Sequence, residues 1–426
     1  MDKTNEKYQA YLQIMQEELV PAMGCTEPIA IAYGAAKGRE LLGGLPDEVV
    51  VEASGNIIKN VKSVVVPNTG GLHGIEAAAA AGVVAGRAEL MLEVISQVTA
   101  EQQEEMRTYL KEHPVHVEFL DGELVFDIQI TLRRGRDEAK VRIANYHTNI
   151  VHLEKNGEVL LDLPVEADSE SGLTDRSLLT MADIYDFAQT VDLDDVRSVL
   201  DRQIDCNTAI SQEGLTHSYG ANIGQVIQNT SRPDDPIAKA KAAAAAGSDA
   251  RMGGCELPVI INSGSGNQGI TASVPVIVYA REIGAGEEKL YRALVLSNLI
   301  TIHQKTRIGR LSAYCGAVSA GAAAGAAIAW LDGGDYESVI HTVVNALAII
   351  SGMICDGAKA SCAGKIAAAI DAGVLGYRMY QNGQQFYGGD GIISRGIEHT
   401  LDNVGRLGKI GMRSTDKEIL QIMLQT

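Results

Sequence analysis

Residues 315–330 read CGAVSAGAAAGAAIAW, and residues 355–373 read CDGAKASCAGKIAAAIDAG. Both stretches are dominated by Ala and Gly, a composition that indicates helices packed closely against their neighbours. The whole chain holds 45 Gly and only 4% aromatic residues, so close backbone approach must fill much of its interior. Apolar runs such as residues 75–85 and 317–329 are shorter than the roughly 20 residues of a membrane span. The sequence therefore predicts helices crowded together inside the protein.

The second half of the chain, from residue 207 to the end, continues this alternation of Ala-rich helices and Gly-rich loops, and its longest strand-like run is residues 274–279. The first 90 residues are mixed, because helical periodicity there gives way to short strand patterns. In order, the predicted elements are helices over residues 8–42 with a turn at 20–28, strands at 49–52 and 62–66, and an Ala-rich helix at 74–87.

Period-two apolar patterns follow a predicted helix at about residues 88–112 and predict an antiparallel sheet. The predicted strands are residues 115–119, 124–132, 139–146 and 150–154, and helices are expected again over about 178–210. The chain thus predicts an α+β fold in two domains. A mainly helical Ala/Gly-rich domain (residues 1–89 and 201–426) would carry an inserted antiparallel-sheet α+β domain (residues 90–200).

Charge and the N-terminal sequence exclude several classes of protein. The formal net charge of -18 opposes binding to nucleic acid or to anionic membranes, which depends on clustered Lys and Arg. The start, MDKTNEKYQAYLQIMQEELV, is charged and helix-patterned and does not resemble a signal peptide. We therefore expect a cytoplasmic protein, whose six cysteines are metal ligands, catalytic thiols or small buried hydrophobes rather than disulfide partners.

Three cysteines, Cys315, Cys355 and Cys362, each come just before an Ala/Gly-rich predicted helix. The N-terminus of a helix carries about half a positive charge and unpaired N–H groups, which stabilise a thiolate or an anionic centre bound to it. Several such ends together could host an iron–sulfur cluster. The spacing C-x39-C-x6-C matches neither a ferredoxin nor a paired CxxC zinc site, so three inert buried thiols remain the alternative.

A fourth cysteine, Cys25, lies in the segment PAMGCTEP at residues 21–28. Thr26 is suited to cap the helix that follows, and Pro28 is suited to its first turn. Cys25 would then face a helix N-terminus, which lowers the pKa of a thiol from about 8.5 towards neutrality. This indicates a general base or a nucleophile, with a structural loop thiol as the alternative.

Four segments of the chain resemble a known family. They are PAMGCTEP (21–28), SGSGNQGITASVP (263–275), HQKTRIGRLSAYCGAVSAG (303–321) and CDGAKASC (355–362). These motifs resemble the L-cysteine desulfidases, which are relatives of the iron–sulfur L-serine dehydratases through their alpha-chain domain. The resemblance implies that Cys315, Cys355 and Cys362 hold three irons of a 4Fe-4S cluster. It also implies that Cys25 accepts a proton and that the fourth iron is free for substrate.

The chain departs from the dehydratase pattern near its C-terminus. The last Cys-to-Cys spacing is shorter, and no cysteine follows Cys362, whereas dehydratases of this type can place a C-terminal cysteine on the open iron. This favours the desulfidase branch. Cys206 and Cys255 lie outside the matched motifs and are interpreted as small buried hydrophobes.

The run SGSGNQG at residues 263–269 precedes an apolar segment. Its successive backbone N–H groups could form a nest for the substrate carboxylate, assisted by Ser263, Ser265, Asn267 and Gln268. A tight turn that permits close packing is the alternative. Upstream of Cys315, the basic residues His303, Lys305 and Arg307 either place positive charge near the substrate or form a solvated surface.

The sequence thus predicts a carbon–sulfur lyase that uses a 4Fe-4S cluster to convert L-cysteine into pyruvate, ammonia and hydrogen sulfide. Its partners would be a small amino-acid substrate and, in a homo-oligomer, further copies of the chain, but no nucleic acid and no membrane. Three alternatives remain open: an L-serine dehydratase with the same chemistry, a non-enzymatic iron–sulfur sensor, and a zinc protein.

Overall fold

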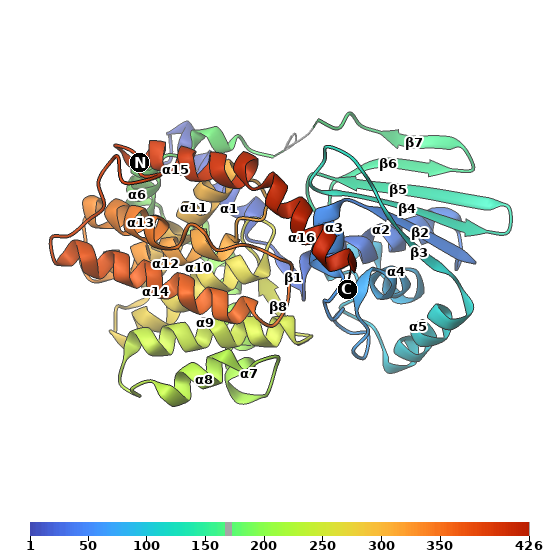
Figure 1. The fold of residues 1–426 in the computed structure, drawn as a ribbon, viewed down its shortest axis with the longest axis horizontal. Helices are drawn as coiled ribbons and strands as arrows, with labels where there is room; N and C mark the ends of the chain where they lie inside the picture. Colours follow the sequence, from blue (N-terminus) through green and yellow to red (C-terminus); the bar gives the residue numbers. More distant parts are fainter. Residues whose placement is uncertain (167–172, 426) are drawn as a thin grey trace.

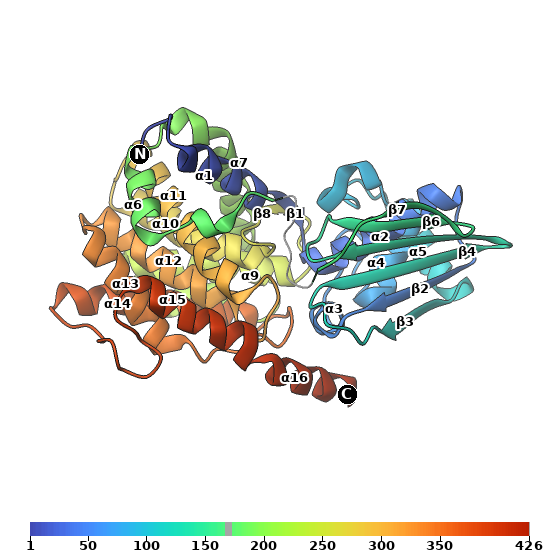
Figure 2. The ribbon, with the colours of Figure 1, turned by 90° about the horizontal axis from the view of Figure 1, so that it is seen from above.

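The computed structural model describes residues 1–166 and 173–425. Helices gather on one side of the molecule and a twisted sheet lies on the other, as Figures 1 and 2 show. We call these parts the helical lobe (residues 1–25 and 173–425) and the sheet lobe (residues 26–163). Across the described residues, no helix has both the length and the apolar character needed to span a membrane. The predicted α+β fold with a dominant helical part is confirmed.

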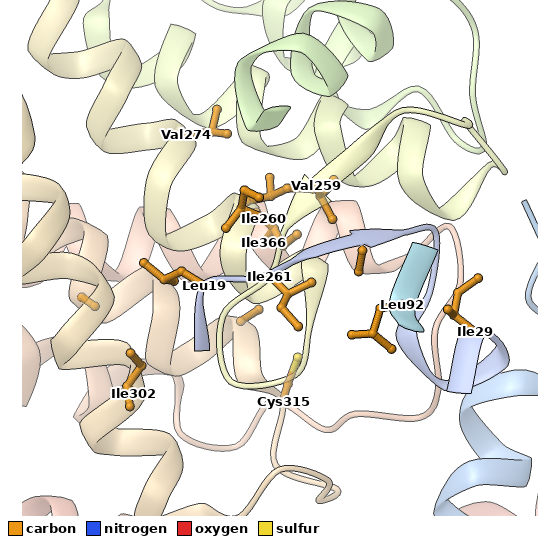
Figure 3. Close-up of a cluster of buried hydrophobic side chains, with 14 of the residues drawn as sticks. Leu19, Ile29, Leu92, Val259, Ile260, Ile261, Val274, Ile302, Cys315 and Ile366 are labelled. Carbon is orange, nitrogen blue, oxygen red and sulfur yellow. The ribbon is translucent and has the colours of Figure 1, made fainter. Parts of the chain in front are cut away.

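The helical lobe is built from long helices and one small two-stranded sheet. Its helices are α1 (Glu6–Glu18), α6 (Met181–Thr190), α7 (Leu193–Thr216), α8 (Ile223–Thr230), α9 (Pro236–Met252), α10 (Gly266–Glu282), α11 (Glu287–Ile308), α12 (Gly316–Leu331), α13 (Tyr336–Ile350), α14 (Cys362–Gln381), α15 (Ile397–Arg406) and α16 (Arg413–Gln425), with short turns η2 (Arg176–Leu178) and η3 (Leu407–Gly411). Strands β1 (Pro21–Met23) and β8 (Pro258–Ile260) pair antiparallel. Figure 3 shows apolar side chains packed around these two strands, with Cys315 at the edge of the cluster.

The sheet lobe holds a six-stranded sheet in the order β3-β2-β4-β5-β6-β7. Its elements are α2 (Thr26–Leu42), β2 (Glu48–Ala53), α3 (Gly55–Val61), α4 (Gly74–Ala85), η1 (Ala88–Glu93), α5 (Ala100–Glu112), β3 (Val115–Phe119), β4 (Asp127–Arg134), β5 (Asp137–Ala144), β6 (Ile150–Lys155) and β7 (Glu158–Asp162). Helix α2 packs on β4 and β5. Gly38 permits this close approach, because a Cβ atom there would collide with Leu132.

Several predicted elements need correction. The sheet is mixed rather than antiparallel, because β2 pairs in parallel with β3, a long-range pairing that local patterns do not reveal. Residues 62–66 form no strand, because α3 ends at Val61, a turn follows it, and Val65 makes only an isolated bridge with His73. The run 274–279 lies inside α10, since an apolar stretch alone does not distinguish a buried strand from a buried helix. The domain limits 1–89, 90–200 and 201–426 stay a prediction, although β2 itself belongs to the sheet.

Helices α12 and α14 run parallel at very close range. A Cβ atom on Gly321 would lie 2.6 Å from the Ala369 carbonyl carbon, and one on Gly325 would lie 2.5 Å from that of Gly373. Both contacts advance by four residues in the same direction, so the two helices start at the same end. This packing carries Cys315, just before α12, and Cys362, at the start of α14, to one end of the helical lobe.

We expect Gly373→Ala to destabilise the protein by about 1–3 kcal/mol, because overpacking forces backbone shifts. The new Cβ atom would collide with the Gly321 carbonyl oxygen. The matched control is Gly364→Ala in the same helix, where a Cβ atom meets no atom within 4 Å. This substitution should stabilise the helix by about 0.5–1 kcal/mol, because alanine favours a helix more than glycine does. Thermal unfolding followed by circular dichroism measures both changes. Equal midpoints for the two variants would contradict the close packing.

Candidate active site

Two of the predicted cluster cysteines lie on paired backbone segments. Tyr314 and Ile354 form an antiparallel bridge, and beside it Cys315 N–H donates to Met353 O at 3.1 Å. Cys315 is the N-cap of α12, as predicted. Cys355, in contrast, lies in the loop between α13 and α14 and does not begin a helix. Its position is fixed instead by the backbone pairing, because Cys355 N–H donates to Ala313 O at 2.6 Å.

The three thiols are electrostatic neighbours. Burial, together with the charges of Cys355 and Cys362, raises the pKa of Cys315 to about 12. Backbone N–H groups work in the opposite direction: that of Ala317 lowers the pKa of Cys315, and that of Lys359 lowers the pKa of Cys362. The structure thus brings together all three cysteines that the motifs singled out, with N–H donors aimed at two of the sulfurs.

Only one member of the basic triplet faces these thiols. Burial lowers the pKa of the Lys305 amine to about 8, even though Cys355 and Cys315 act in the opposite direction. His303 and Arg307 point elsewhere, and both contact the carboxylate of Glu398, at 2.9 and 2.6 Å. The triplet therefore splits: Lys305 brings charge to the cysteines, and the other two hold helix α15 against α11.

The donor set fits a cluster better than a single ion. Within residues 1–166 and 173–425, no three His, Cys, Asp or Glu side chains stand in the geometry of a mononuclear metal site. In a four-iron cluster each thiolate binds a different iron, so the three sulfurs need not meet at one point. Backbone donors at Cys315 and Cys362 and the Lys305 amine suit a cluster that carries negative charge.

Cys25 is the N-cap of α2. Its thiol donates a hydrogen bond to Glu27 Oε2 at 3.0 Å. Burial and the Glu27 carboxylate raise the pKa of Cys25 well above its ordinary value, so the predicted shift towards neutrality is wrong. Thr26 is not the cap either, because its hydroxyl donates to Gly264 O at 2.8 Å. The helix N-terminus is present, but the adjacent carboxylate outweighs it.

Two further ionisable residues beside Cys25 were missed by the sequence analysis. Glu27 accepts from Asn60 Nδ2 at 3.0 Å, and although burial raises its pKa, His147 and the Cys25 thiol lower it below the usual value. His147 enters from the β5–β6 connection of the sheet lobe. Burial lowers its pKa to about 4, and its Nε2 has no hydrogen-bond partner among the described residues. A Cβ atom on Gly264 would lie 2.9 Å from its ring.

The predicted nest forms a tight turn followed by the start of α10. Asn262 and Ser265 exchange two backbone hydrogen bonds of 3.1 Å, and Ser263 donates its hydroxyl to Asn262 Oδ1 at 2.9 Å. Ser265 is the N-cap of α10 but gives it no side-chain hydrogen bond. The carbonyl oxygens of the Asn267 and Gln268 side chains have no partner in the described part of the chain. The tight turn is therefore present, and the unpaired side-chain oxygens on it are hydrogen-bond acceptors.

This turn also links Cys25 to the three-cysteine end. Thr26 holds Gly264 on one side, and on the other a Cβ atom at Gly316, directly after Cys315, would lie 2.5 Å from the Gln268 side chain. The first turn of α10 therefore stands between α2, with Cys25, and α12, with Cys315.

Comparison with known proteins identifies the family. Residues 89–421 match the family described as serine dehydratase alpha chain. The chain belongs to this family. Among its relatives, a UPF0597 protein of Desulfitobacterium hafniense (strain Y51) is 60% identical over 424 residues, which cover 100% of this chain and 98% of the relative. A UPF0597 protein of Treponema denticola is 49% identical over 430 residues, covering 100% of both.

The match to the serine dehydratase alpha chain family confirms the relationship that the sequence motifs suggested. The family match begins at residue 89, so the segment with Cys25 and Glu27 lies outside it. Full-length relatives such as the Desulfitobacterium protein nevertheless cover that segment. Of the cysteines without a predicted role, Cys255 is buried and Cys206 is half-buried.

Proposed function

We propose that this serine dehydratase family member is an iron–sulfur L-cysteine desulfidase, a carbon–sulfur lyase that forms pyruvate, ammonia and hydrogen sulfide. The observation that supports the proposal is the mutual electrostatic effect of Cys315, Cys355 and Cys362, together with the hydrogen bond from the Cys25 thiol to Glu27. Three thiolates leave one iron of a four-iron cluster without a protein sulfur.

A four-iron cluster held by Cys315, Cys355 and Cys362 would supply a Lewis-acidic iron for the sulfur that leaves. The chain itself moves the protons. The Cys25 thiol would take the α-proton of L-cysteine while its own proton moves to Glu27 Oε2, 3.0 Å away, so that a free thiolate need not form before substrate is bound. Cleavage of the Cβ–S bond releases sulfide and 2-aminoacrylate, which takes up water to give pyruvate and ammonia.

L-serine is the second candidate substrate, because the family is described as serine dehydratase alpha chain. Loss of water would replace loss of sulfide, and the same residues would serve. L-cysteine is favoured by the missing C-terminal cysteine after Cys362. It is also favoured because a thiolate is a softer ligand for iron than a hydroxyl.

Anaerobic purification should give a brown protein with about four irons per chain, as three ligating thiolates and one open position imply. Iron and sulfide analysis measures this, and exposure to air should bleach the colour. We expect kcat/KM for sulfide release from L-cysteine to exceed kcat/KM for ammonia release from L-serine. A reversed ratio would make the protein a serine dehydratase.

A loaded cluster without either activity would support the sensor alternative, and colourless protein containing only zinc would exclude the cluster.

A further inference from the structure

Arg251, in the last turn of α9, is a buried cation that forms no direct ion pair among the described residues. Its residue is 3% exposed, and Nε donates to Gly24 O at 2.9 Å. Among the described residues, Arg251 forms no ion pair, and its two terminal nitrogens have no hydrogen-bond partner. Arg176 shows the usual arrangement, since it is also buried but pairs with Glu18 at 2.7 Å. The two terminal nitrogens of Arg251 therefore have free donors that an anion could bind.

The surroundings of Arg251 point to where that anion would lie. A Cβ atom on Gly266, the first residue of α10, would lie 2.8 Å from Arg251 Cζ. The guanidinium therefore rests against the N-terminus of α10, where backbone N–H groups lack intrahelical partners and where Ser265 provides no side-chain cap. Arg251 also lowers the pKa of both Cys25 and Glu27, which places its positive charge beside the predicted proton acceptor.

Two hydrogen-bond acceptors lie on the same first turn of α10. Within residues 1–166 and 173–425, the side-chain oxygens of Asn267 and Gln268 have no hydrogen-bond partner, and Gln268 packs against Gly316, next to Cys315. A ligand on this turn would therefore find a cation and N–H donors at one end, carbonyl acceptors beside them, and the cysteines beyond. A carboxylate, an ammonium group and a thiol match these three environments in order.

We propose that Arg251 binds the α-carboxylate of the amino-acid substrate at the N-terminus of α10. This inference rests on the proposed function and adds to it a residue that selects α-amino acids over simple thiols. The unpaired oxygens of Asn267 and Gln268 accept hydrogen bonds from the α-ammonium group, and the thiol points to Cys315.

The test compares two fragments of L-cysteine. 3-Mercaptopropionate keeps the thiol and the carboxylate, and cysteamine keeps the thiol and the amine. Their dissociation constants are measured by anaerobic calorimetry with the cluster-loaded full chain, as wild type, Arg251→Met, Arg251→Lys and the control Arg232→Met. Arg232 is exposed, so this control removes an equal charge elsewhere. Arg251→Met should raise the dissociation constant of 3-mercaptopropionate by about 10- to 100-fold, the usual effect of losing a charge-assisted hydrogen bond.

The dissociation constant of cysteamine should change by less than about threefold in Arg251→Met. Arg251→Lys should recover part of the affinity for 3-mercaptopropionate. Equal weakening of both fragments would overturn the inference, because Arg251 would then act only by holding Gly24 and the Cys25 segment. Unchanged affinity in Arg251→Met, or wild type that does not bind 3-mercaptopropionate, would overturn it as well. If the carboxylate effect holds but wild type releases no sulfide from L-cysteine, the proposed function fails and the carboxylate site stands.

Discussion

Cys25→Ala is expected to slow sulfide release by about 10²- to 10⁴-fold, the usual cost of removing a general base and equivalent to roughly 3–5 kcal/mol of transition-state stabilisation. Iron content should remain at the wild-type level, because Cys25, whose thiol hydrogen-bonds to Glu27, is proposed as the proton acceptor and not as a cluster ligand. L-cysteine should still bind, so its addition should perturb the cluster absorption of the variant. Iron analysis, absorption spectra and steady-state rates under anaerobic conditions measure these three properties.

Glu27→Gln tests the same proton path from its other end. The amide keeps the size of the side chain and its hydrogen bond to Asn60, but it cannot receive the proton of Cys25. We expect a loss of rate of the same order as in Cys25→Ala, again with full iron content. Loss of iron from Cys25→Ala would instead make Cys25 a fourth ligand, and His147 would become the first candidate for the base. Unchanged rates in both variants would show that the pair is structural.

The features that depend on local sequence could be predicted. Ala/Gly-rich stretches marked α12 and α14, and Cys315 at the start of α12 follows from where that pattern begins. The strand at Val115–Phe119 has the predicted limits, because the alternation of its side chains is a local property. In these cases the nearest residues along the chain decide the structure.

Features that depend on distant contacts could not be predicted. His147 looks like an ordinary loop residue between two strands, and only the meeting of the two lobes buries it beside Glu27 and Gly264. Arg251 ends an Ala-rich helix, where a basic residue usually stabilises the helix dipole at the surface. The predicted pKa shift of Cys25 was wrong for a related reason. Its predicted direction considered the helix N-terminus alone, whereas burial and the adjacent carboxylate act more strongly.

Replacing any one of Cys315, Cys355 and Cys362 by alanine should lower iron content and activity together, since the resemblance assigns each thiolate to a separate iron. Changes in residues that merely support metal ligands already cost about 10- to 100-fold in metal affinity, so loss of a ligand should leave little cluster. Cys355→Ala is the most informative variant, because its backbone pairing with Ala313 does not require the sulfur and should keep the loop in place.

Cys206→Ala is the matched control, since this half-buried thiol lies on α7 and outside the cysteine group. It should retain its iron, its colour and its rate of sulfide release, while each of the three cluster variants loses all of them at unchanged helical content by circular dichroism. Preserved folding separates loss of a ligand from general instability, which thermal unfolding would detect in parallel. A variant of Cys315, Cys355 or Cys362 that keeps four irons would remove that cysteine from the ligand set. The cluster would then need another donor, and Cys25 would be the first to examine, because it is the remaining cysteine linked to this end of the lobe through Thr26 and Gly264.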